Sequence, residues 1–270
     1  MHPILFKIGS LPINSYGLML AISFLLGVKL ASKRGLKLGI PSDDTLNFSI
    51  WVMVAAIVGS RAFYVVTHLE QYSQDPLAIV AFWNGLYGLS MLGGVILAMI
   101  VGFAWIIKKR WPIWSFADAV IPSFALGIFI TRIGCFLNGC CFGSATECSV
   151  GITFPTGSLP FSIFGSHPIH PAQLYSSLGG LVILVILLWA DRRKNFPGFI
   201  FSMFLGLYGA TRFGMEEFRY FDHAPSSSFG FSVFANRPGM TDNQLISLGM
   251  VLASIILGLW LYYKNRKVSS

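Results

Sequence analysis

Charged residues are scarce in this chain. Only 11% of its 270 residues are charged and 54% are hydrophobic, whereas a soluble domain carries about 25% charged residues. So few charges leave too little polar surface to cover a globule in water. This scarcity excludes an ordinary soluble domain and predicts a polytopic membrane protein.

Acidic residues are scarcer than basic ones, and this imbalance indicates which molecules the protein binds. The chain has 11 acidic and 19 basic residues, giving a formal net charge of +8. In a membrane protein such an excess sets the orientation and attracts anionic lipid. We therefore expect membrane lipids as partners and no nucleic acid.

Two further absences narrow the class of membrane protein. No internal repeat is visible, although transporters are often built from inverted repeats. A small-molecule transporter is therefore the less favoured alternative, even though Pro122 interrupts one apolar stretch. The last apolar stretch has no lysine before Lys264, which excludes the Schiff base that a retinal protein needs.

Seven apolar stretches are long enough to cross a bilayer, which takes roughly 20 residues of helix. We predict an all-α membrane protein with seven transmembrane helices, folded as a single integral membrane domain over residues 1–270. No small-residue cleavage site follows the first stretch, so we expect a retained span rather than a signal peptide. The stretches lie near 14–33, 46–68, 86–107, 115–135, 172–190, 197–215 and 244–263.

Two loops stand out by their Ser, Gly and Pro content, at about 136–171 and 217–243. Within the first loop, residues 144–169 alternate apolar and polar side chains between Gly and Pro turns. This pattern predicts a small irregular or strand-bearing cap on the outer face, over the site.

Basic residues follow the first, third, fifth and seventh spans. All four clusters therefore lie on one side of the membrane, which the positive-inside rule identifies as the cytoplasm. We expect the N-terminus outside and the C-terminus in the cytoplasm. The clusters are Lys29, Lys33, Arg34 and Lys37; Lys108, Lys109 and Arg110; Arg192, Arg193 and Lys194; and Lys264, Arg266 and Lys267.

Four arginines are left inside spans or at their outer ends: Arg61, Arg132, Arg212 and Arg219. A charge in a span costs about 2.5 kcal/mol or more, so each must be paired or face a polar cavity. Glu216 lies four residues after Arg212, which predicts an ion pair. Arg132 has no acid nearby in its span. Because guanidinium groups bind phosphate in a bidentate fork, we expect an anionic lipid headgroup here.

The four cysteines lie close together in the sequence, in and just after T-R-I-G-C-F-L-N-G-C-C-F-G at 131–143. They are Cys135, Cys140, Cys141 and Cys148. The outer face permits disulfides, so a bond from Cys148 to Cys140 or Cys141 is one possibility. A zinc site is the less favoured one, because the spacing is not a repeated C-x-x-C.

Glycines and histidines in the same region suggest further roles. We expect Gly139 and Gly143 to form a turn that points backbone N–H groups at a ligand. A thiol nucleophile in this region would need a base nearby, for which His167 and His170 are the candidates.

Six motifs in order resemble one known family. They are S-Y-G-L-M-L at 15–20, G-S-R-A-F-Y at 59–64, L-G-G at 92–94, the 131–143 motif, H-P-A-Q-L-Y at 170–175 and Y-G-A-T-R-F-G-M-E-E-F-R at 208–219. The chain resembles the bacterial prolipoprotein diacylglyceryl transferases over nearly its whole length.

The resemblance implies an enzyme of the bacterial cytoplasmic (inner) membrane that acts in lipoprotein maturation. It would move diacylglyceryl from phosphatidylglycerol to the lipobox cysteine thiol of a prolipoprotein signal peptide, releasing glycerol phosphate. The nucleophile is then the substrate's thiol. We expect a monomer that needs no cofactor and no metal.

The resemblance also implies roles for individual residues. Arg132 and Arg212 would be catalytic, binding the phosphodiester and stabilising its negative charge as it departs. The residues that would bind phosphatidylglycerol are Arg132, Tyr16, Arg61, Asn138, Gly143, Tyr208 and Glu216.

The chain departs from the family pattern at three positions. Leu92 stands where well-known members have histidine, and Cys135 and Cys140 stand where members often have asparagine and glutamate. Either another group takes the thiol proton (His170, Glu216 or water), or the chain is a catalytically inert paralogue that binds phosphatidylglycerol. The intact arginines favour an active enzyme.

Overall fold

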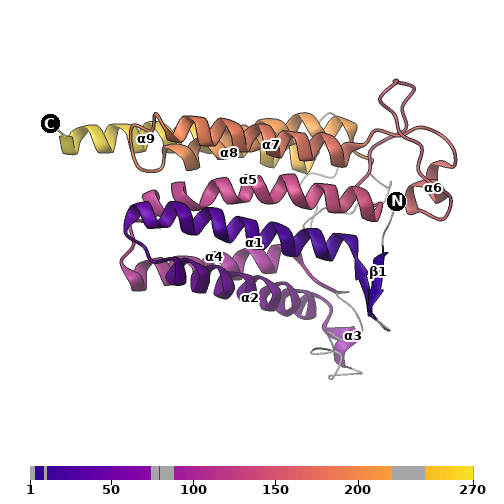
Figure 1. Cartoon of the computed structure of the whole chain (residues 1–270), viewed down its shortest axis with the longest axis horizontal. Coiled ribbons are helices and arrows are strands. Elements are labelled where there is room, and N and C mark those ends of the chain that lie inside the picture. Colours follow the sequence, from indigo (N-terminus) through magenta and orange to yellow (C-terminus); the bar gives the residue numbers. More distant parts are fainter. Residues whose placement is uncertain (1–3, 9–10, 74–78, 80–87, 221–240, 270) are drawn as a thin grey trace.

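Seven long helices run along a common axis in the computed structural model, which describes residues 4–8, 11–73, 79, 88–220 and 241–269 (Figure 1). Two short helices and two 3-10 turns join them in the described part of the chain. The long helices are α1 (Ser15–Gly35), α2 (Ser42–Thr67), α4 (Met91–Lys109), α5 (Ile113–Asn138), α7 (Ala172–Asp191), α8 (Phe199–Met215) and α9 (Asp242–Ser269). The short elements are η1 (Leu36–Leu38), α3 (Leu69–Ser73), α6 (Leu159–Phe164) and η4 (Glu216–Phe218).

Six of these helices are long and apolar enough to cross a membrane: α1 with η1, α2, α4, α5, α7 and α9, counted over the described residues. Their outer faces leave large apolar side chains exposed, among them Leu25 and Ile256. A helix that is apolar all round belongs in lipid. The chain is therefore a multi-pass membrane protein, and the prediction of seven spans is confirmed for six. The remaining helix, α8, has 17 residues.

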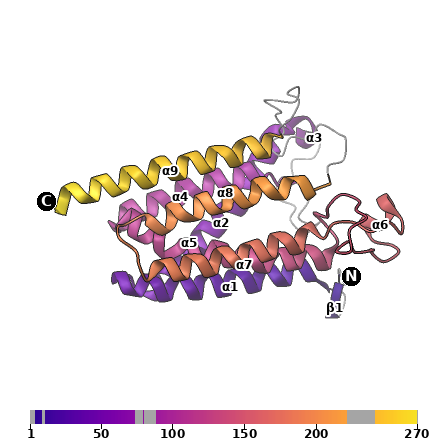
Figure 2. The same ribbon diagram turned by 90° about the horizontal axis from the view of Figure 1, so that it is seen from above.

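The helices pack in pairs. α1 lies along α5, α2 along α4, α5 also along α7, and α8 along α9; Figure 2 shows α9 beside α8 from above. The α2–α4 contact is close because glycines face each other there. A Cβ atom on Gly59 would lie 2.5 Å from the carbonyl oxygen of Gly93, so only glycine lets the two backbones approach in this way.

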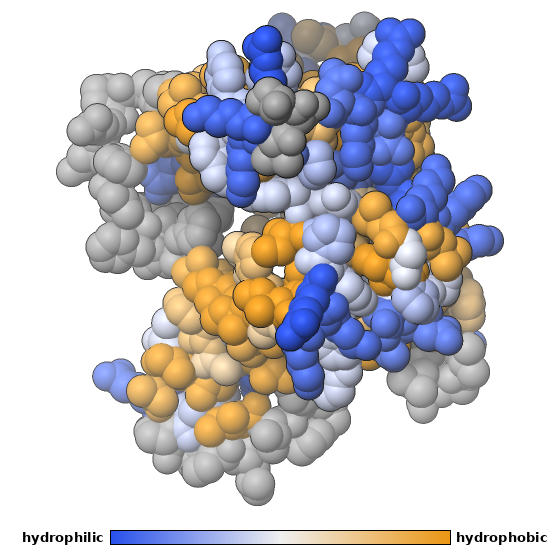
Figure 3. All heavy atoms as spheres, turned by 90° about the vertical axis from the view of Figure 1, so that its left-hand side faces the viewer, coloured by the Kyte–Doolittle hydropathy of each residue, from blue (hydrophilic) through white to orange (hydrophobic). Residues whose placement is uncertain are grey.

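The two ends of the bundle differ in character. One end carries the turns after α1, α4 and α7 and the C-terminus of α9 (Figure 1), and these are the segments with the four basic clusters. Figure 3 looks onto this end, where hydrophilic residues cover much of the surface. The other end carries α3, α6 and an antiparallel hairpin of β1 (Ile4–Ile8) and β2 (Leu11–Asn14), which the sequence did not suggest.

A buried polar network holds the helices together at the basic end. Asp118 of α5 is fully buried, and its carboxylate accepts hydrogen bonds from the backbone N–H groups of Gly198 (2.8 Å) and Phe201 (2.9 Å) at the start of α8. Arg34 of α1 donates to the Asp191 carboxylate at 2.9 and 3.0 Å. A carboxylate satisfying the first N–H groups of a helix acts as its cap. The network fixes α8 relative to α5.

The loop between α5 and α7 forms a small aromatic core. Phe142, Phe154 and Ile169 are buried together in it. The irregular part of the predicted cap fits this segment, but the strands are not confirmed. Among its described residues the segment forms isolated bridges, such as Ala145 with Ile169, and the short helix α6. Of the other predicted loop, residues 221–240 lie outside the described part of the structure.

Candidate active site

Three arginines and two tyrosines line a cavity of about 390 Å³ between α5, α7, α8 and the segment after η4. It lies in the half of the bundle away from the basic end. Its volume falls within the usual range of small-molecule sites, about 300–1,000 Å³. The polar lining residues used below are Thr131, Arg132, Cys141, Tyr175, Ser176, Tyr208, Arg212 and Arg219.

Arg132 sits on α5, partly buried, with its side chain in the cavity lining. Within the described residues its guanidinium has no hydrogen-bond or ion-pair partner. A charge left without a protein partner in a membrane span marks a site for a ligand of opposite charge. Arg132 is thus available to an anion that enters the cavity.

Arg212 faces the same cavity from α8 and is held by Glu216. The Arg212 Nη1 to Glu216 Oε2 distance is 2.9 Å, which confirms the predicted ion pair, although the donor geometry falls short of a hydrogen bond. The Glu216 side chain is 1% exposed. Its other oxygen accepts hydrogen bonds from Thr241 Oγ1 (3.0 Å) and Asn243 Nδ2 (2.8 Å). Glu216 therefore positions Arg212 and connects α8 to α9, and it does not line the cavity itself.

Arg219 follows η4 and adds a third positive charge. Burial lowers the pKa of Arg219, and the charges of Arg212 and Arg132 lower it further, whereas Glu216 and Cys141 act to raise it. Desolvation and like charges both disfavour the charged form of a base. An anion in the cavity would relieve this repulsion, so the electrostatics favour binding of an anion.

The other predicted lipid-binding residues differ in whether they line this cavity. Tyr208 lines the cavity and stacks on Phe204. Tyr16 is exposed at the start of α1 and Asn138 is exposed at the end of α5. Arg61 of α2 donates to the backbone carbonyl groups of Ile79 and Gly88, each at 3.0 Å. These last three residues do not line the cavity, although Tyr16 lies close enough to Arg132 to interact with its charge. That they border one lipid pocket with Arg132 stays a prediction.

The glycine turn after α5 is structural. The Gly139 N–H bonds to the carbonyl groups of Cys135 (3.0 Å) and Phe136 (3.3 Å), and the Gly143 N–H bonds to the carbonyl of His170 (3.0 Å). The expectation that these N–H groups point at a ligand is therefore wrong, because helix and loop contacts already satisfy them. Gly143 is needed for another reason. A Cβ atom there would lie 2.6 Å from the His170 carbonyl oxygen and would also meet the backbone of Phe218.

One face of α7 supplies cavity residues that the sequence analysis missed. Ala172, Tyr175, Gly179 and Ile183 recur at helical spacing along it, with Ser176 and Gly180 beside them. The signal was present as small residues three to four apart in an apolar helix, a pattern that lets another group approach the helix closely. The Tyr175 hydroxyl lies 3.3 Å from His170 Nδ1, which connects His170 to the cavity.

Leu92 lies in the first turn of α4, which packs against α2. It does not line the arginine cavity. The described residues that line the cavity come from α5, α7, α8 and the segment that follows α8.

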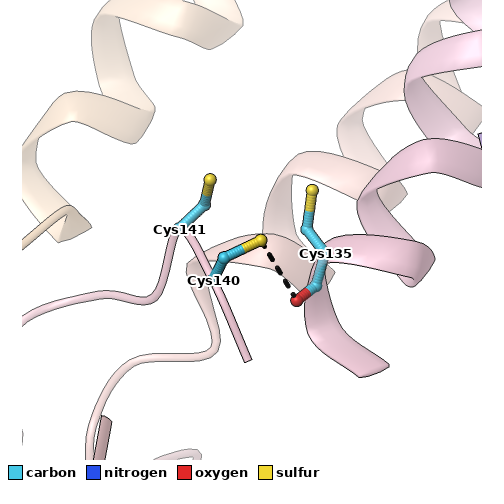
Figure 4. Close-up of side chains that lie close together, drawn as sticks. All are labelled: Cys135, Cys140 and Cys141. Carbon is cyan, nitrogen blue, oxygen red and sulfur yellow. Dashed lines mark hydrogen bonds between the residues drawn. The ribbon is translucent and has the colours of Figure 1, made fainter. Parts of the chain in front are cut away.

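All four cysteines are free thiols, and three of them gather beside the cavity (Figure 4). The sulfur atoms of Cys135, Cys140 and Cys141 lie within 4.8 Å of one another, whereas Cys148 is exposed and outside the group. The bond considered between Cys148 and Cys140 or Cys141 does not form here. Hydrogen bonds from Cys135 and Cys140 lower the pKa of Cys141, and the charges of Arg132 and Arg219 lower it further.

The fold and the cavity together define a multi-pass membrane protein whose helices enclose a cavity lined by three arginines. Comparison with known proteins narrows this class. The sequence profile described as prolipoprotein diacylglyceryl transferase matches residues 3–260. The chain belongs to the prolipoprotein diacylglyceryl transferase family, as its motifs predict.

Several relatives match most or all of the chain. A phosphatidylglycerol–prolipoprotein diacylglyceryl transferase of Clostridium tetani is 34% identical over 81% of this chain and 86% of its own length. A second, from Clostridium perfringens, is 32% identical over 95% of this chain and 94% of its own. A third, from Desulfotalea psychrophila, is 32% identical over the full chain and 97% of its own length.

Proposed function

We propose that this chain transfers diacylglyceryl from phosphatidylglycerol to the lipobox cysteine thiol of prolipoproteins and releases glycerol phosphate. Family membership supports the reaction. One observation supports the arginine cavity as the site of this reaction. Arg132 is an intramembrane arginine without a hydrogen-bond or ion-pair partner among the described residues, and it shares the cavity with Arg212 and Arg219.

The proposed chemistry is a substitution at the glyceryl carbon. The sulfur of the lipobox cysteine attacks that carbon, a C–S bond forms, and the C–O bond to phosphate breaks. The phosphate goes from a diester with about one negative charge to a monoester with nearly two. Arg132 and Arg212 would stabilise the charge that develops on it, and they act strongly because little water surrounds them.

The thiol must also lose its proton, and His170 is the acceptor we propose. Its Nδ1 lies 3.3 Å from the hydroxyl of Tyr175, a residue that lines the cavity. A proton could therefore pass from the thiol through Tyr175 to His170. Glu216 is less suitable, because Arg212, Thr241 and Asn243 already occupy its oxygens.

Changing His170 to glutamine should lower the transfer rate about 10²-fold or more, the usual contribution of a positioned base. Tyr175→Phe should cause a similar loss, whereas His167→Gln, an exposed histidine in the same loop, is the matched control. A normal transfer rate in His170→Gln would eliminate this proton route.

We further infer that α8 is the seventh span and that the whole chain is one membrane domain. α8 packs against both α7 and α9, although its 17 residues are few for a span. The N-terminus would lie outside and the C-terminus in the cytoplasm of the bacterial inner membrane, which the basic end supports. The loop before α7 would cap the cavity on the outer side, and the protein would act as a monomer.

Transfer can be tested directly with purified protein in proteoliposomes. Phosphatidylglycerol and a lipobox peptide would be added, and the peptide followed by mass for a diacylglyceryl adduct. An adduct together with released glycerol phosphate is the expected result. Binding of phosphatidylglycerol with no adduct would instead identify a catalytically inert paralogue, the alternative raised by Leu92.

A further inference from the structure

We propose that Cys135, Cys140 and Cys141 form a binding site for a thiophilic metal ion, Zn²⁺ or Cu⁺, beside the arginine cavity. The three sulfur atoms lie within 4.8 Å of one another. A Zn–S bond is about 2.3 Å long, so two sulfurs on one tetrahedral ion are about 3.8 Å apart. Small side-chain rotations would bring all three within bonding distance.

The local backbone gathers these side chains. Gly139 ends α5 with φ of 78°, and the Cys140 N–H turns back to bond the Cys135 carbonyl at 3.1 Å. Cys141 follows with φ of 60°, a left-handed conformation that is unfavourable for a non-glycine residue. Figure 4 shows the three side chains close together, at the end of α5 and in the turn after it.

The turn is held rigidly in this shape. Gln173, fully buried on α7, donates from its amide nitrogen to the Cys140 carbonyl at 2.9 Å. Two of the three positions therefore lie in a turn fixed to α7, and the third lies in the last turn of α5. A ligand set that is already ordered binds a metal without first having to be organised.

The chemistry of the ligands selects the ion. Three sulfurs without a carboxylate in the group favour Zn²⁺ or Cu⁺ over Mg²⁺ or Ca²⁺. Three thiolates with Zn²⁺ carry a net charge of about −1, which Arg132 and Arg219 would balance, since both act electrostatically on Cys141. Three protein ligands also leave one position of a tetrahedral ion open, as in catalytic rather than structural zinc sites.

Metal binding can be measured without lipid or peptide, so the result does not depend on the proposed function. The full chain would be purified in detergent with a phosphine reductant, incubated with Zn²⁺ or with Cu⁺, desalted and analysed for metal by mass spectrometry. We expect about one ion per chain. Cys140→Ser/Cys141→Ser should lose it, and Cys148→Ser, which alters the exposed fourth cysteine, should keep it.

A second measurement on the unmodified chain guards against misfolding of the variants. Zn²⁺ should slow alkylation of Cys140 and Cys141 at least tenfold, while Cys148 reacts as before, and a chelator should reverse the protection. Equal alkylation with and without metal would overturn the proposal. A chain mass two hydrogens lower before reduction would also overturn the proposal, if two of the three cysteines then resisted alkylation after chelation. Those two cysteines would then form a disulfide.

Discussion

Arg132→Ala should lower the rate of diacylglyceryl transfer about 100- to 1,000-fold, the usual effect of removing one group that stabilises transition-state charge. The physical reason is that the guanidinium has no hydrogen-bond or ion-pair partner among the described residues, so we expect it to bind the phosphate of the substrate. The loss should fall mainly on kcat, because the charge on phosphate grows as the C–O bond breaks. Transfer to a lipobox peptide in proteoliposomes measures it.

Two controls separate charge from geometry. Arg132→Lys keeps the charge and loses the bidentate fork, so it should recover only part of the rate. Arg110→Ala removes an exposed arginine at the basic end of the bundle and should leave the rate unchanged. If Arg132→Ala transferred diacylglyceryl as fast as Arg110→Ala, the cavity would not be the site of phosphate binding.

Arg212→Ala should both destabilise the protein, by about 3 kcal/mol, and reduce transfer as strongly as Arg132→Ala does. The stability falls because Glu216 has a side chain only 1% exposed and would lose its counter-charge at 2.9 Å. Removing one partner of a buried pair leaves the other charge uncompensated. The midpoint of thermal unfolding in detergent and the transfer rate would be measured on the same preparation.

The double variant Arg212→Gln/Glu216→Gln separates the two roles. It removes both charges and keeps side chains that hydrogen-bond, so most of the lost stability should return. The transfer rate should stay low, because Arg212 is absent from the cavity. Recovery of transfer along with stability would mean that Arg212 acts only through folding and has no direct effect on the phosphate.

The sequence predicted the helices well because the signal for a membrane span is local. Twenty apolar residues form a helix wherever they occur in a bilayer, and six of the predicted spans match helices long enough to cross one. α8 is the exception, since its 17 residues end where η4 begins. The N-terminal hairpin was missed because two short strands without a wide hydrophobic face leave little pattern in a sequence.

The sequence predicts a site residue where its charge is costly inside a membrane or where its spacing from a partner fits a helix. Arg132 stands out because an unpaired charge in a span is expensive, and Arg212 with Glu216 follows from the four-residue spacing of a helix. The cysteine cluster could not be found in this way. It depends on the left-handed backbone at Cys141 and on Gln173, 33 residues beyond Cys140.

The most direct test of the central claim is to fill the cavity. Gly179 of α7 lines it, and a Cβ atom there would meet nothing within 4 Å, so Gly179→Phe should fold normally and occupy the space where the lipid phosphate would bind. Leu178→Phe is the matched control, because Leu178 is 61% exposed on the outer surface of the same helix. We expect Gly179→Phe to abolish transfer to a lipobox peptide and Leu178→Phe to preserve it. Equal transfer by both variants would show that the reaction takes place elsewhere in the protein.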